Sequence, residues 1–100
     1  MKDQTTYKLI DNEAQKRYEF HIDGHKAILE YIKVKDKIYL THTEVPKALG
    51  GQGIGSQLVL QVLQLIDEQH LTLVPLCPFV AMYIKRHPEW RRVVMRNVNF

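Results

Sequence analysis

The chain has 100 residues, of which 45% are hydrophobic and 25% are charged, and its formal net charge at pH 7 is +3. This length predicts a single domain over residues 1–100, and the composition is ordinary for a soluble protein with one packed core. The sequence pI of about 9.1 suits an anionic ligand. The excess of positive charge is too small to favour a nucleic-acid binder.

The cellular setting is predicted from cysteine usage and apolar runs. Cys77 is the single cysteine, so a disulfide within the chain is excluded and a reducing compartment is expected. Met1–Thr6 lacks the apolar stretch of a signal peptide, and no apolar run approaches the roughly 20 residues that cross a bilayer. We therefore expect a cytoplasmic protein without a membrane partner. No metal-ligand spacing is present, so no metal site is expected.

The first half of the chain predicts strands. Tyr18, Phe20 and Ile22 alternate with polar residues, and Asp23-Gly24 is a strong signal for a tight hairpin turn. A second turn is expected at Lys35-Asp36. The expected strands are Lys8–Asn12, Arg17–Asp23, Lys26–Val34 and Lys37–Val45, of which the last three should form an antiparallel meander.

The second half of the chain is more helical. Apolar residues from Ile54 onward recur at helical spacing and predict a long helix that ends near His70. Leu71–Leu76 is short and apolar and predicts a buried strand. A second helix is expected over Phe79–His87, ended by Pro88. Trp90–Phe100 is basic and apolar and is left unassigned.

The order strand, loop, helix, strand has a consequence for the ligand site. Ile38–Val45 and Leu71–Leu76 flank the long helix, so they are expected to be parallel neighbours joined by a right-handed crossover. The loop Pro46–Gly53 then follows the carboxyl end of a strand, where ligands bind in sheets of this kind.

That loop contains four of the five glycines of the chain, between Gly50 and Gly55. Glycine allows left-handed backbone angles and a close approach of ligand to main chain. The first amides of the following helix have no intrahelical acceptors, so the loop is suited to a phosphate or pyrophosphate. A Walker A motif is excluded because Gly55 is followed by Ser56 and Gln57 with no lysine. The alternating glycines also differ from the dinucleotide fingerprint.

Four segments resemble the short, stand-alone YjdJ-type branch of the GCN5-related N-acetyltransferases. These segments are Thr41–Pro46 (THTEVP), Gln52–Gly55 (QGIG), Val74–Val80 (VPLCPFV) and Tyr83–Pro88 (YIKRHP). The resemblance covers roughly Lys8 to Trp90. It implies a small α/β (α+β) fold with a mixed, mostly antiparallel sheet, a parallel strand pair splayed around the cofactor, and two main helices.

The resemblance also implies acetyl-CoA as the cofactor. Strand amides at Thr43 and Val45 would polarise the thioester carbonyl. In this family the glycine-loop motif begins with glutamine or arginine, and that position is Gly50 here. The usual side-chain contact near the phosphates is therefore missing. Lys47 is the nearest cation in the sequence. The pyrophosphate would lie on the amides of Gly51, Gln52, Gly53, Ile54, Gly55 and Ser56.

Four residues are candidates for catalysis. Glu44 is the leading candidate for a general base and shares a strand face with His42. Its alternative is a solvent-exposed strand end. Tyr83 matches the tyrosine that protonates the coenzyme thiolate in larger relatives, or it packs in the core. Cys77 is either an acyl acceptor, with His42 as a nearby base, or a small buried hydrophobe, and the second reading is favoured.

The function expected from these residues is an acetyl-CoA-dependent N-acetyltransferase. Its amine acceptor is unidentified and is either a small molecule or a protein lysine. The alternative is a CoA-binding or protein-interaction module with little or no catalysis. A nucleic-acid-binding domain is disfavoured, because its basic residues are spread over several elements: Lys33, Lys35, Lys37, Lys85, Arg86, Arg91 and Arg92.

Overall fold

The computed structural model describes residues 7–98, and its centre is one five-stranded sheet with the strand order β1-β2-β3-β4-β5. Neighbouring strands are antiparallel except for β4 and β5, which are parallel. The elements are β1 (Ile10–Asn12), β2 (Arg17–Ile22), β3 (His25–Val34), β4 (Lys37–Glu44), η1 (Lys47–Leu49), α1 (Ile54–Glu68), β5 (Thr72–Pro75), α2 (Pro78–Arg86) and η2 (Pro88–Val93). Met1–Thr6, for which the sequence predicts no signal peptide, lies outside the described residues, as do positions 99 and 100.

The predicted meander and the parallel pair are both confirmed, and the strand ends differ from the prediction by one or two residues. The turn between β2 and β3 has φ of 50° at Asp23 and 79° at Gly24, which is the left-handed geometry that a two-residue hairpin requires. Lys35 has φ of 56° in the turn between β3 and β4. The first strand is shorter than predicted and begins at Ile10.

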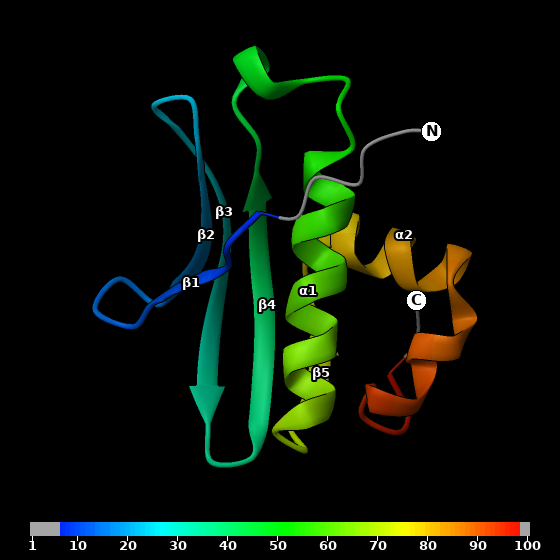
Figure 1. The fold of residues 1–100 in the computed structure, drawn as a ribbon. Helices are drawn as coiled ribbons and strands as arrows, with labels where there is room; N and C mark the ends of the chain where they lie inside the picture. The colour runs from blue at the N-terminus through cyan, green and yellow to red at the C-terminus, as the bar shows by residue number, and fades with distance from the viewer. Residues whose placement is uncertain (1–6, 99–100) are drawn as a thin grey trace.

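The hydrophobic core lies between one face of the sheet and the helices. Tyr18, Phe20, Leu29 and Leu40 are fully buried on that face. The helix α1 packs against β2 and β3, while α2 contacts β4, β5 and α1 (Figure 1). The buried residues of α1 occupy a wide stripe, because the helix meets the sheet on one side and α2 on the other: Ile54, Gly55, Leu58, Val59, Val62, Leu63 and Ile66.

The segment left unassigned from Trp90 onward returns to the sheet. Val94 forms an isolated parallel bridge with Leu73, and the amide of Met95 donates a hydrogen bond to the Leu73 carbonyl at 2.8 Å. Within residues 7–98, no helix has both the length and the apolar character needed to cross a membrane.

Strand β4 is irregular at Thr41, and this irregularity positions the site. Glu30 pairs with His42, whereas the next residue, Tyr31, pairs with Leu40, so Thr41 is an extra residue opposite β3. An extra residue exchanges the two faces of a strand and increases its local twist. Before the bulge the even-numbered residues of β4 face the core, and after it the odd-numbered Thr43 does so.

Candidate functional site

The parallel strands β4 and β5 separate halfway along β4. Their pairing ends at Leu40 opposite Pro75. The amides of Leu76 and Cys77 both donate to the Leu40 carbonyl, at 3.0 and 2.9 Å, and the chain then turns into α2. The last four residues of β4, Thr41–Glu44, continue beyond the end of this pairing. A wedge therefore opens between the two parallel strands at the carboxyl end of β4.

The glycine loop lies at the open end of this wedge. Gly51 and Gly53 have φ of 76° and 71°, in the left-handed region that glycine adopts without strain. Gly53 is the N-cap of α1, and the first amide bonded into the helix is that of Gln57, which donates to the Gly53 carbonyl at 3.1 Å. Among the backbone hydrogen bonds within residues 7–98, none is donated by the six amides from Gly51 to Ser56.

A cavity of about 450 Å³ joins this loop to the end of β4. Lys47 is the cationic residue of its lining, and Val45, Leu49 and Phe79 are apolar residues. The unpaired amides and the positive end of the α1 dipole make the loop an anion site. The lining residues are Val45, Pro46, Lys47, Leu49, Gly50, Gly51, Gly53, Ile54, Gly55, Ser56 and Phe79.

This lining agrees with most, but not all, of the residues predicted to bind a cofactor. Gln52 and Thr43 are absent from it: Gln52 is exposed in the loop, and Thr43 lies deeper along β4. Gly55 of α1 packs against Phe79 of α2, since a Cβ atom there would lie 3.0 Å from the Phe79 ring. The glycine at this position lets the two helices meet beneath the cavity.

His42 and Glu44 lie together on the exposed face of β4, as predicted. His42 Nε2 is 3.3 Å from Glu44 Oε1, and the side chains are 54% and 66% exposed. This pair is open to solvent and can exchange protons with a molecule that reaches the end of β4 from that face.

Cys77 lies on the opposite face of β4. The residue is 4% exposed, and its thiol is hydrogen-bonded to the Thr43 hydroxyl, with 3.2 Å between Sγ and Oγ1. Because successive side chains of a strand point to opposite faces, His42 is directed away from this thiol. The suggestion that His42 is a base next to Cys77 is therefore wrong.

Tyr83 is half-buried on α2 and stacks on His87, with the ring centroids 4.1 Å apart. Burial and the carboxylate of Glu89 raise the pKa of Tyr83, so its hydroxyl keeps its proton at neutral pH. The ring lines a second, smaller cavity of about 60 Å³, together with Ser56, Phe79, Met82, Arg86 and His87.

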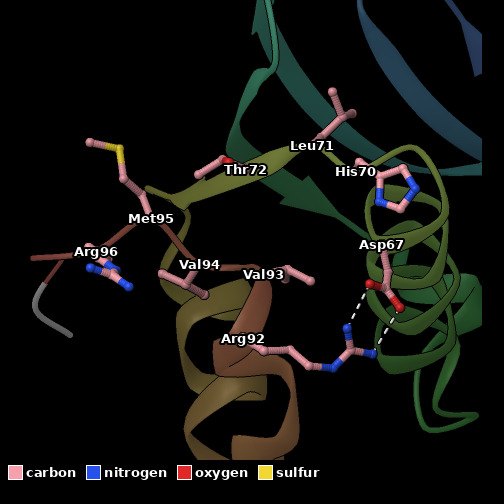
Figure 2. A pocket seen from close by; sticks show the side chains of 9 residues that line it. All are labelled: Asp67, His70, Leu71, Thr72, Arg92, Val93, Val94, Met95 and Arg96. Carbon is pink, nitrogen blue, oxygen red and sulfur yellow. Dashed lines mark hydrogen bonds and ion pairs between the residues drawn. The ribbon is translucent and has the colours of Figure 1, made fainter.

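A separate cavity of about 340 Å³ lies at the other end of β5 (Figure 2). Across it, the guanidinium of Arg92 donates two hydrogen bonds to the Asp67 carboxylate, at 2.6 and 2.8 Å, and joins η2 to α1. The pKa of Asp67 is lowered by this partner. None of the residues predicted to bind a cofactor or catalyse a reaction lines this cavity, so the loop end of the molecule is the candidate site.

A family model for GCN5-related N-acetyl-transferases matches residues 17–93, which run from the start of β2 to the end of η2. The chain belongs to this family. Among its relatives is Protein NATD1 of Mus musculus, which is 31% identical over 83 residues that cover 79% of this chain and 76% of that protein. Protein NATD1 of Homo sapiens is 36% identical over 64 residues, which cover 63% and 57% of the two chains.

The fold agrees with this assignment. A GCN5-like protein from Staphylococcus aureus, solved in solution by NMR, superimposes with a TM-score of 0.68 over 92% of this chain and 91% of that one, at 22% identity. The predicted architecture of the GCN5-related N-acetyltransferases, with a mixed sheet, a splayed parallel pair and two main helices, is confirmed.

Proposed function

We propose that this protein binds acetyl-CoA at the glycine loop and transfers the acetyl group to an amine. The observation that carries the proposal is the set of six unpaired amides from Gly51 to Ser56 at a 450 Å³ cavity that reaches the open end of β4. An amide cluster at a helix N-terminus fits a pyrophosphate. The open stretch of β4 beyond Leu40 gives the remainder of an elongated ligand a backbone edge to follow.

Each part of the site has a role in this proposal. The loop amides and the Lys47 ammonium hold the pyrophosphate, while Val45 and Phe79 pack against the apolar arm of the ligand. When bound, acetyl-CoA supplies the activated acyl group. The amides of Thr43 and Val45 lie on the strand edge where they can polarise the thioester carbonyl.

Proton transfer is assigned to Glu44 and Tyr83. Glu44 accepts the proton of the incoming ammonium, directly or through water, and His42 at 3.3 Å orients the carboxylate. Tyr83 is the proposed proton donor to the departing thiolate, since its raised pKa keeps the hydroxyl protonated. The exposed His42–Glu44 pair suits an amine presented on an open surface, either a protein lysine or a small molecule.

Amide chemical shifts test where the cofactor binds. In a titration of ¹⁵N-labelled protein with acetyl-CoA, the largest changes are expected in the amides from Gly51 to Ser56, with smaller changes from Thr43 to Val45. Amides that line the cavity beside Asp67 and Arg92 serve as the internal control and should stay unchanged. Shifts confined to the cavity beside Asp67 and Arg92, or no shifts at saturating acetyl-CoA, would refute the proposal.

A second candidate function is a CoA-binding module without turnover. It is favoured by the exposure of His42 and Glu44, 54% and 66%, because an enclosed acceptor site strengthens general-base catalysis. Binding of acetyl-CoA without transfer to any amine in a broad screen, including lysine peptides and polyamines, would favour this second function.

A further inference from the structure

The sheet carries an apolar patch on the face opposite the core. Ile32 pairs with Tyr39, and Tyr39 pairs with Val74, so these three side chains form one row across β3, β4 and β5. Val34 follows two residues along β3 on the same face. Ile32 and Val34 are 50% and 51% exposed, whereas Tyr39 is half-buried and Val74 is buried. We call these four residues the open-face patch. A contiguous apolar patch of this kind is typical of an interaction site.

The bulge in β4 places the candidate base on the same face as this patch. In a regular strand, His42 and Glu44 would face the core with the other even-numbered residues of β4, and the extra residue Thr41 reverses this. Ile28 then pairs with Glu44, and Ile28 shares a face of β3 with Ile32, four residues away. At about 3.3 Å per residue, the row of apolar side chains lies about 13 Å from Glu44 along the strands.

A second carboxylate lies between the base and the patch. Glu30 pairs with His42 on β4 and lies two residues from Ile32. Its neighbour on β2 is Arg17, whose Nε is hydrogen-bonded to Glu19 at 2.6 Å instead. Among the ion pairs of residues 7–98, none includes Glu30. This carboxylate is therefore available to a cation that approaches the sheet.

The charges and the shape of this face indicate what it binds. Glu30 and Glu44 favour a cation, while the lysines that β3 and β4 carry on this face, Lys26 and Lys37, lie outside the interval between Ile28 and Ile32. None of the three cavities described above is lined by residues of this face between Glu44 and the open-face patch. A small amine is usually enclosed in a pocket, whereas an uncovered surface with apolar and acidic parts fits a polypeptide that carries a lysine and an apolar side chain.

We propose that the acceptor is a polypeptide that docks on the open-face patch, with an apolar side chain against Ile32 and Tyr39 and its lysine at Glu44. This inference rests on the proposed acetyl transfer. Four extended residues span about 13 Å, so the apolar residue of the acceptor lies about four positions from the lysine. The reaction is unchanged: the lysine nitrogen takes the acetyl group from sulfur, the thiol of CoA is released, and one proton passes to solvent through Glu44.

The proposal is tested with two peptides of equal length, each with a single lysine. One carries leucine at the fourth residue on both sides of the lysine, and the other carries serine at these positions. Mass spectrometry of the acetylated peptides gives kcat/KM for the wild type and for Ile32→Thr, which keeps the branched Cβ that strands favour. The wild type should prefer the leucine peptide about tenfold, since the patch covers one apolar side chain. In Ile32→Thr the preference should disappear, with kcat/KM for the serine peptide unchanged.

Met82→Gln is the matched control, because Met82 is 46% exposed and apolar but lies on α2, away from the patch. It should keep the wild-type preference between the peptides. The proposal is overturned if Ile32→Thr keeps the preference, if Met82→Gln loses it equally, or if N-acetyl-lysine methylamide is acetylated as efficiently as the leucine peptide. Equal acetylation of both peptides by the wild type would overturn this inference alone, whereas bound acetyl-CoA without acetylation of any peptide or amine would overturn the proposed transfer as well.

Discussion

Two side-chain pairs occupy opposite faces of β4 beyond the bulge, and they have different environments. His42 and Glu44 are exposed and 3.3 Å apart, whereas Thr43 and Cys77 are joined by a hydrogen bond at 3.2 Å with the thiol buried. A general base must reach the amine that receives the acetyl group. The exposed pair is therefore suited to catalysis and the covered pair to packing. This division leads to a prediction for each pair.

Glu44→Gln should lower the rate of acetyl transfer by about 100-fold, the lower part of the range for loss of a general base. The melting temperature and the affinity for acetyl-CoA should stay unchanged, because the side chain is 66% exposed and lies outside the cavity lining. Steady-state kinetics measure the effect, with Glu68→Gln at the exposed end of α1 as the control. A Glu44→Gln protein with the wild-type rate would exclude Glu44 as the base.

Cys77→Ala should keep its turnover and lose about 1 kcal/mol of stability, a typical cost for a small change in a core. The reason is that Cys77 is 4% exposed and the hydrogen-bond partner of its thiol is a hydroxyl rather than a base. Intact-protein mass spectrometry after incubation with acetyl-CoA supplies the second readout. An acetyl group found on Cys77, together with lost turnover in the variant, would instead assign covalent catalysis to this thiol.

Glu19 is a buried carboxylate on β2 whose pKa leads to a pH prediction. Burial raises its pKa, but hydrogen bonds from His21, Arg17 and Asn12 and the charge of Arg17 outweigh this effect and lower the pKa from 4.5 to about 2. A carboxylate with a lowered folded-state pKa stabilises the protein above its unfolded-state pKa, and this stabilisation is lost as pH falls toward the folded-state value.

Glu19→Gln should therefore melt at a lower temperature than the wild type at pH 7. The difference should be constant down to about pH 4.5 and should shrink between pH 4.5 and about 2. Thermal unfolding followed by circular dichroism across this range is the measurement. The Glu19 account is wrong if the difference between the two proteins is the same at pH 3 as at pH 7.

At the scale of elements, the glycine loop and α1 were predictable from the sequence, and the bulge in β4 was not. The glycines between Gly50 and Gly55 and the helical period from Ile54 are local signals. Thr41, in contrast, is an ordinary strand residue, and its role depends on pairing with Glu30 and Tyr31 from β3. Lys37–Val45 was consequently predicted as one regular strand.

Phe79 lines the cavity and was missed for the same kind of reason. In the sequence it is one apolar residue near the start of a helix. Its position at the loop depends on how α2 packs against α1, where the Phe79 ring meets Gly55.

The loop itself can be tested by restoring the family side chain. Gly50 has φ of −67° and ψ of 155°, an extended conformation open to any residue, and a Cβ there needs only a small shift from the Lys47 carbonyl at 3.2 Å. Gly50→Arg should bind acetyl-CoA about tenfold more tightly than Gly50→Ala. Both variants add a Cβ atom, so the difference between them reports the effect of the guanidinium alone. Equal affinity of the two variants by calorimetry would place the phosphates away from position 50.

At the scale of the whole molecule, the two ends of the β4–β5 pair differ in structure. At one end the strands part, and the loop leaves six amides unpaired within the described chain. At the other end, the Arg92–Asp67 pair and the Leu73–Val94 bridge close the structure. Figure 1 shows the glycine loop at the arrowhead end of β4, with α1 running from it along the sheet. Ligand binding and structural closure are thus separated along the molecule.

The central claim, that acetyl-CoA binds this chain, is tested most directly by thermal unfolding with and without the cofactor. Acetyl-CoA at about 100 times its dissociation constant adds about 2.7 kcal/mol to the free energy of unfolding. For a domain of this size, the melting temperature should rise by roughly ten degrees or more. ATP and NAD, which carry phosphates without the pantetheine arm, should produce a much smaller rise. No rise with acetyl-CoA, or an equal rise with all three ligands, would contradict the account.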